Sequence, residues 1–89
     1  MQISKAPEWM ECWKLNSGDQ SGAPKWVLKG ITLLGLYYAD WFWIVETPFG
    51  KTIAFDGDYV IRLGEEFLVA SLNDVQAGKF VLREGPEDG

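Results

Sequence analysis

The sequence predicts an α+β fold: a small, mainly antiparallel β-sheet, flat or curled into a barrel-like shape, with one or two short helices. Three observations support this fold class. Strand-forming runs occupy most of residues 41–67, Gly-containing turns separate these runs, and two short segments outside this region carry helix signals. The chain of 89 residues fits a single domain, 1–89, with the acidic tail 85–89 expected to be frayed.

The first third of the chain is expected to hold a strand and a short helix. Residues 8–15 alternate partially between two faces, which predicts a strand, and the Gly- and Ser-rich segment 16–24 predicts an exposed loop. Pro24 favours the start of a helix, and Gly30 favours its end. For residues 31–38 we expect a short strand or turn, with an extension of the helix as the alternative.

The segment from Trp41 onwards predicts a meander of three or four strands. Residues 41–47 are apolar at nearly every position, so we expect both faces of this strand to be covered, one by a helix and the other by another element or a partner. Pro48-Phe49-Gly50 predicts a hairpin turn, and Asp56-Gly57 predicts a second tight turn. Gly64 predicts a third turn, so that successive strands would lie side by side.

The last part of the chain predicts a helical turn followed by a strand. Ser71 is an N-cap candidate, Asp74 follows at the third helical position, and Gly78 provides a stop. Residues 79–84 then favour a short final strand.

Charge and composition exclude several functional classes. Thirteen acidic against eight basic residues leave a formal net charge of −5, which disfavours direct binding to nucleic acid. The chain has no His and one cysteine, Cys12, so it lacks the side chains that form the usual zinc sites or a cysteine–histidine thiolate pair. Cys12 is expected to be a buried small hydrophobe. No membrane segment or secretion signal is visible, so a reducing cytoplasm is expected.

Four carboxylates near the predicted turns are the acidic candidates: Asp56, Asp58, Glu65 and Glu66. Oxygen ligands of this kind could hold a divalent cation, but their spacing does not match a calcium loop, and ordinary turn chemistry explains the Asp-Gly-Asp sequence better. No nucleophile motif or phosphate-binding loop is present, so we expect neither an enzyme nor a metal or cofactor site.

The aromatic content exceeds what a small core is expected to hide. The chain has five Trp, three Tyr and five Phe residues. Trp26 and Trp43 are expected in the core, whereas an aromatic patch facing a partner, or a second copy in a homodimer, would use the others. The aromatic candidates are Trp9, Tyr37, Tyr38 and Trp41.

The order of these features resembles a group of small, uncharacterised bacteriophage and prophage proteins. Lys5, Pro7 and Trp13 are similar to the opening of that group. The other matching motifs are Thr47-Pro48-Phe49-Gly50, Gly57-Asp58-Tyr59-Val60-Ile61-Arg62, Gly64-Glu65, and Phe80 followed by Glu84. The chain departs from the group at Phe67–Ser71, where a Tyr-Pro-Cys-Lys-Pro stretch is usual. The resemblance implies phage origin and the host bacterial cytoplasm, and no established activity.

These observations favour a non-enzymatic phage accessory protein that binds a host protein through an acidic and aromatic surface. Inhibition of a defence or nucleic-acid-handling factor is the expected consequence. One alternative is a small-ligand sponge for a signalling nucleotide, although Lys and Arg are scattered along the chain. Another is a structural or assembly protein of the virion, in which strand edges pair between copies.

Overall fold

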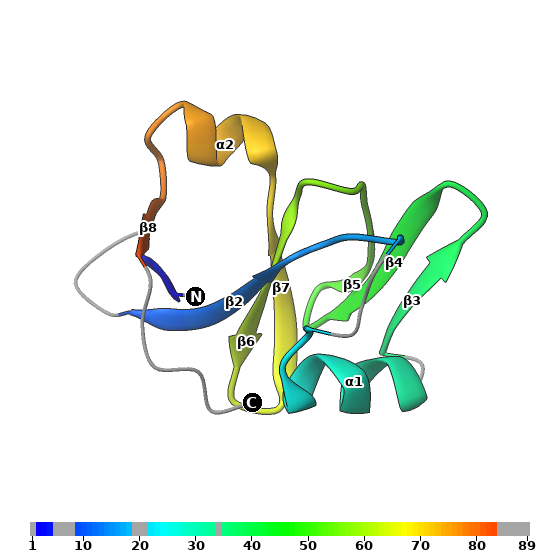
Figure 1. Ribbon diagram of the computed structural model, residues 1–89. Helices are drawn as coiled ribbons and strands as arrows, with labels where there is room; N and C mark the ends of the chain where they lie inside the picture. The colour runs from blue at the N-terminus through cyan, green and yellow to red at the C-terminus, as the bar shows by residue number, and fades with distance from the viewer. Residues whose placement is uncertain (1, 5–8, 19–21, 34, 84–89) are drawn as a thin grey trace.

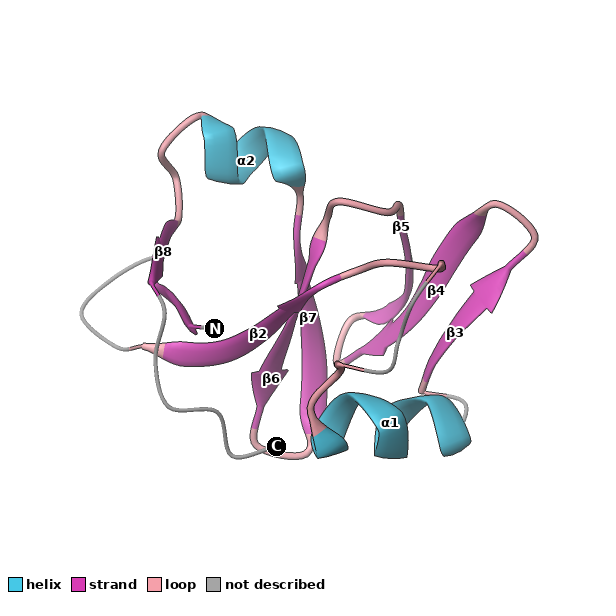
Figure 2. Cartoon of the chain, viewed as in Figure 1, coloured by secondary structure: helices cyan, strands magenta, loops and turns pink. Residues whose placement is uncertain are grey.

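Two antiparallel β-sheets and two short helices make up the structure, a computed structural model (Figure 1). It describes residues 2–4, 9–18, 22–33 and 35–83. In chain order the elements are β1 (Gln2–Ser4), β2 (Met10–Lys14), α1 (Lys25–Thr32), β3 (Leu36–Ala39), β4 (Phe42–Thr47), β5 (Gly50–Ala54), β6 (Tyr59–Leu63), β7 (Glu66–Ala70), α2 (Leu72–Gln76) and β8 (Val81–Arg83). The predicted α+β class with a mainly antiparallel sheet is confirmed (Figure 2).

The strands divide into a five-stranded sheet, in the order β7-β6-β2-β1-β8, and a three-stranded sheet, in the order β3-β4-β5. The sheets do not close into a barrel. The predicted continuous meander is also wrong, because β5 pairs only with β4 while β6 pairs with β2 and β7. The turn around Gly57, where φ is +100°, therefore carries the chain from one sheet to the other instead of closing a hairpin.

Strand β6 crosses to the other sheet because both of its faces are apolar. Val60 is fully buried on the side of the three-stranded sheet and α1, whereas Tyr59 and Ile61 are buried on the side of α2. A strand with two buried faces needs a neighbour at each edge and a layer on each side. The first apolar cluster comprises Leu15, Val27, Leu36, Trp43, Val45, Ala54 and Val60, and the second comprises Ile3, Cys12, Tyr59, Ile61 and Ala70.

Helix α1 extends beyond its predicted end. Gly30 lies inside the helix and is buried, and the helix ends at Thr32, so the prediction that Gly30 terminates it is wrong. A Cβ atom at Gly30 would lie 2.6 Å from Cζ of Phe67. Gly30 therefore permits close packing of α1 on the aromatic ring, a tertiary role that local pattern does not reveal. The predicted choice for residues 31–38 has a mixed outcome, since the helix takes the first two and β3 begins at Leu36.

Most of the other local predictions are confirmed. Gly50 has φ of +113° and ends the hairpin turn between β4 and β5, and Ser71 caps α2 by accepting a hydrogen bond from the amide of Asp74 at 3.1 Å. Strand β1 was not predicted, because three residues carry too little pattern. The tail 85–89 lies outside the described residues.

Replacing Gly30 with Ala is expected to lower the free energy of unfolding by about 1 kcal/mol. Alanine favours a helix by ~1 kcal/mol over glycine, but overpacking against Phe67 costs about 1–3 kcal/mol. Urea unfolding followed by Trp fluorescence measures the balance. Thr32→Ala, at an exposed position of the same helix, is the control and is expected to be neutral or slightly stabilising. A Gly30→Ala variant more stable than wild type by about 1 kcal/mol would show that the ring moves aside without cost.

Candidate functional site

One face of the three-stranded sheet points away from the core and carries a row of large apolar side chains. Register places Tyr37 opposite Ile44, and Ile44 opposite Ile53, across all three strands. Their neighbours Trp43, Val45 and Ala54 are buried on the other face, so alternation directs the row outwards. We call this the outer face; its members are Tyr37, Phe42, Ile44, Ile53 and Phe55, with Trp41 at one end.

The outer face is open to solvent at its largest side chains. Trp41 is 68% exposed, Ile53 59% and Phe55 46%. Trp41 stacks on Phe55 with ring centroids 5.8 Å apart, and it meets Phe42 edge-on at 5.1 Å. The rings therefore support one another as a connected aromatic group. A contiguous apolar patch of this kind is a common mark of a binding surface.

For the second face of residues 41–47 we expect cover by another element or by a partner. The described residues leave Trp41, Ile53 and Phe55 of this face exposed, so cover by another element is not found, and cover by a partner stays a prediction. Trp43 and Val45 are fully buried, but Ile44 on the opposite face is only half-buried. A run that is apolar on both alternating faces looks the same in the sequence whether its second face meets another layer of the protein or solvent.

Three glutamates border the outer face at the end near the β4–β5 turn. Glu46 lies on the same face as Ile44, two residues further along β4, and is exposed. A surface hollow of about 260 Å³ brings it together with Glu65 and Glu66 from the β6–β7 hairpin. We call these three residues the acidic edge. Lys51 stands opposite Glu46 in the strand register, and the hollow that joins the three carboxylates has no basic residue in its lining.

The carboxylate of Asp56 serves the fold. It accepts hydrogen bonds from the indole Nε1 of Trp43 at 2.8 Å, from the backbone amide of Ser17 at 3.0 Å and from the hydroxyl of Ser17 at 2.6 Å. The hydroxyl of Ser17 contributes most to holding the pKa of Asp56 below its ordinary value, against the opposing effect of burial, and the indole and amide add to the lowering. Asp56 thus joins the chain after β2 to the buried Trp of β4.

Asp58 has a comparable structural role on the other side of Gly57. Its carboxylate accepts hydrogen bonds from the amide of Phe55 at 2.9 Å, which closes the turn, and from the amide of Leu72 at 2.8 Å, at the start of α2. The four acidic candidates therefore separate into two groups. Asp56 and Asp58 bind their own chain, whereas Glu65 and Glu66 belong to the acidic edge.

The four aromatic candidates also lie in different places. Tyr37 and Trp41 share the outer face. Tyr38 points to the opposite face, where its ring meets that of Trp43 edge-on at 5.4 Å, although it remains 39% exposed. Trp9 is half-buried at the start of β2 and lies under the guanidinium of Arg83, 4.0 Å from its ring centre. The structure thus joins two of the four into one surface.

The side chains that sequence reasoning missed are Phe42, Ile44, Ile53 and Phe55, together with Glu46. For the four apolar side chains the signal was the continuous apolar character of residues 42–45 and 53–55. Local pattern alone could not distinguish an exposed apolar face from a covered one.

The cysteine of the chain and its tyrosine neighbour lie in the core. Cys12 is 1% exposed, as expected of a buried small hydrophobe. Burial raises the pKa of the neighbouring Tyr59 phenol, and Cys12 adds to this effect, so the phenol stays neutral in the core. Among the described residues, no three or more His, Cys, Asp or Glu side chains are grouped so that they could hold a metal ion.

Comparison with known proteins found no match among protein-family models, curated sequences or solved structures. In the portion of the chain that the structure describes, no helix has the length and apolar character needed to cross a bilayer.

Replacing Asp56 with Ala is expected to lower the free energy of unfolding by about 1–3 kcal/mol, because the buried indole N–H of Trp43 would lose its acceptor. Asp56→Asn retains an acceptor oxygen and should lose less. Thermal or urea unfolding measures both, and Glu65→Gln, on the exposed β6–β7 turn, is the control. Equal stability of Asp56→Ala and wild type would contradict the structural role assigned to this carboxylate.

The same carboxylate predicts a pH dependence. Because its folded pKa lies below the ordinary value of 3.8, its contribution to stability is complete above that pH and is lost as the pH falls through the folded pKa. The stability difference between wild type and Asp56→Asn should therefore shrink when unfolding is measured at about pH 3 instead of about pH 6. A difference that grows on acidification would contradict the lowered pKa.

Proposed function

We propose that this chain is a non-enzymatic phage accessory protein that binds and inhibits a host protein in the bacterial cytoplasm, using the outer face and the acidic edge. The observation that carries the proposal is the exposure of Trp41, Ile53 and Phe55 on one sheet face. Rigid aromatic side chains held by their neighbours lose little conformational entropy on binding, which makes them effective interface anchors.

The size of the outer face suits a protein partner. With ~150–250 Å² per aromatic side chain, the exposed parts of Trp41 and Phe55 alone offer on the order of 200–300 Å², before Ile53, Phe42 and Tyr37 are added. A standard interface buries roughly 800 Å² on each partner, which the outer face would supply together with its polar rim.

The acidic edge indicates the chemistry of the partner. Glu46, Glu65 and Glu66 adjoin the apolar face, and the whole chain has a formal net charge of −5. A complementary surface would present an apolar patch bordered by Lys or Arg, a combination found where proteins handle nucleic acid. Asp56 and Asp58 are no longer included in the binding surface, because their carboxylates hold the fold.

Ile53→Lys is expected to abolish the interaction. Lysine is tolerated on an exposed edge strand, but it would bring an uncompensated charge into the centre of the interface. Tagged protein would be used to capture partners from host lysate, and the affinity for each purified partner would then be measured. We expect a loss of at least about tenfold.

Val81→Lys is the matched control, because Val81 is 57% exposed on β8 of the other sheet. A genuine partner is retained by Val81→Lys and lost by Ile53→Lys, with both variants shown to be folded by circular dichroism. A partner lost equally from the two variants, or from neither, would overturn the assignment to the outer face.

Removing charge from the acidic edge is expected to affect mainly the rate of association. Glu46→Gln/Glu66→Gln should reduce the association rate constant and its dependence on salt, because charges at a rim steer encounter more than they hold the complex. Stopped-flow binding at two ionic strengths measures this effect. An unchanged salt dependence would place the charge complementarity elsewhere on the surface.

A further inference from the structure

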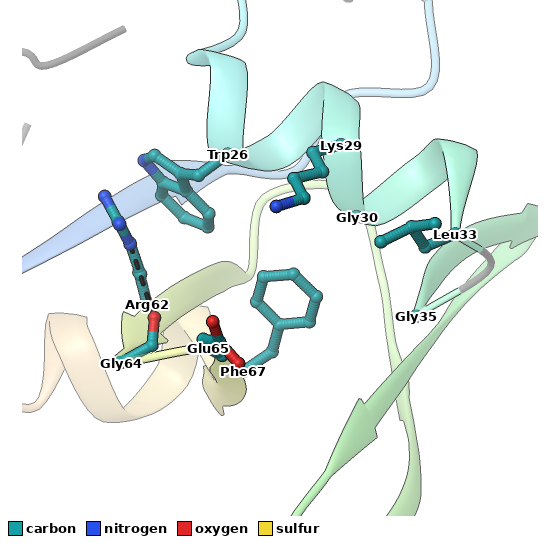
Figure 3. A pocket seen from close by; sticks show the side chains of 9 residues that line it. All are labelled: Trp26, Lys29, Gly30, Leu33, Gly35, Arg62, Gly64, Glu65 and Phe67. Carbon is teal, nitrogen blue, oxygen red and sulfur yellow. Dashed lines mark hydrogen bonds between the residues drawn. The ribbon is translucent and has the colours of Figure 1, made fainter.

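A hollow of about 360 Å³ lies between α1 and the β6–β7 hairpin (Figure 3). This volume falls at the lower end of the range of small-molecule sites, roughly 300–1,000 Å³. The hollow is distinct from the outer face and shares Glu65 with the acidic edge. Its lining combines two aromatic rings, one leucine, two cations, one carboxylate and glycine backbone. Apart from Glu65, the protein-binding proposal does not use these residues.

The two aromatic rings of the hollow offer a surface on which a ligand ring can stack, but no gap into which it can be inserted. The rings of Trp26 and Phe67 have centroids 6.0 Å apart and are inclined by 33°. A ring sandwiched between them would need ~7 Å, twice the ~3.5 Å contact distance of carbon atoms. A planar ligand would therefore lie against the free side of the pair, where one ring contacts Trp26 or Phe67 and leaves their mutual contact intact.

The glycine backbone keeps this surface in place. A Cβ atom at Gly30 would lie 2.6 Å from Cζ of Phe67, and one at Gly35 would lie 3.3 Å from its Cε2. The absence of both side chains lets the Phe67 ring sit directly against α1. The wall is thus formed before a ligand arrives, which reduces the entropy lost on binding.

Two cations face the hollow from different elements. Lys29 projects from α1 towards Phe67, and Arg62 extends from β6 on the side of Trp26 (Figure 3). Arg62 is held in position by Glu11, with Nη1 to Oε2 at 3.3 Å, and donates from Nε to the carbonyl of Gly64 at 3.4 Å. Lys29 makes no ion pair with any residue that the structure describes. In a chain that is acidic overall, the presence of both cations in the lining of one hollow favours an anionic group.

Glu65 adds a constraint on the ligand. Its carboxylate also lines the hollow, so a large negative charge would be opposed there, whereas an N–H or O–H group would find an acceptor. The complete lining therefore suits a ligand with a planar ring, a hydrogen-bond donor and one compact anionic group at a distance from that donor.

We propose that this hollow is a binding site for a small aromatic anion of the size of a nucleoside monophosphate, with its ring on the Trp26–Phe67 pair and its phosphate or carboxylate between Lys29 and Arg62. Base–aromatic stacking of this kind contributes ~1–3 kcal/mol, and the two cations select the anionic end.

Isothermal titration of the full chain tests the ligand class with five probes: GMP, AMP, indole-3-acetate, guanosine and inorganic phosphate. We expect at least one of the first three to bind with a Kd of about 1 mM or tighter, and guanosine and phosphate to bind at least about tenfold more weakly. Tight binding of a nucleotide identifies phosphate as the anionic group, and tight binding of indole-3-acetate identifies carboxylate. No binding by any of these three, or binding of free phosphate as tight as the best of them, would overturn the proposal.

Two variants test the location. Lys29→Glu is expected to weaken binding of the tightest probe at least about tenfold. Lys51→Glu makes the same charge change at an exposed position of β5 and should leave the Kd within about twofold. Trp26→Leu, checked for folding by circular dichroism, should also weaken binding of that probe. Amide shift changes on titration should cluster at Gly30 and Gly35. Equal weakening by Lys29→Glu and Lys51→Glu, or shift changes confined to other elements, would refute the site.

Discussion

The hydrogen bond from the indole of Trp43 to the carboxylate of Asp56 is the interaction on which the arrangement of the two sheets depends. Trp43 is fully buried between the sheets, and its N–H requires a partner there. The same carboxylate binds Ser17, three residues after β2, so one side chain joins β4, the 55–58 turn and the five-stranded sheet. The backbone extends this junction, since the amide of Leu15 donates to the carbonyl of Asp58 and the amide of Gly57 donates to the carbonyl of Leu15.

The proposed surfaces are consequences of this junction. Because the chain leaves the three-stranded sheet after Ala54 and enters the other sheet at Tyr59, the β3-β4-β5 sheet has one face in the core, and the described residues form no second layer on the other face. In a continuous meander β6 would pair with β5, and the outer face would then continue onto a fourth strand. The crossover also sets the β6–β7 hairpin beside α1, where Phe67 packs on Gly30. An apolar face for a protein partner and a hollow for a small anion thus arise from a single change of sheet.

Particular residues show how far the candidate site was predictable. Tyr37 and Trp41 were selected for aromatic surplus, and both lie on the outer face. Tyr38 was selected for the same reason, but period-2 alternation turns it to the side of Trp43. Glu65 and Glu66 lie beside the outer face as part of the acidic edge. In the local sequence Asp56 and Asp58 cannot be told from carboxylates that face solvent. Their structural role is revealed only by hydrogen bonds to residues 13 to 39 positions away along the chain.

The sequence by itself determined the features that depend on neighbours within a few residues: the antiparallel α+β class, the hairpin turn ending at Gly50, the cap at Ser71 and the burial of Cys12. Tertiary structure alone decided which strands pair, why Gly30 lies within α1, and which apolar face remains exposed. The physical reason is that φ preference and capping are local properties of a residue. Burial and strand partnership depend on long-range packing, which a run of apolar residues permits in more than one way.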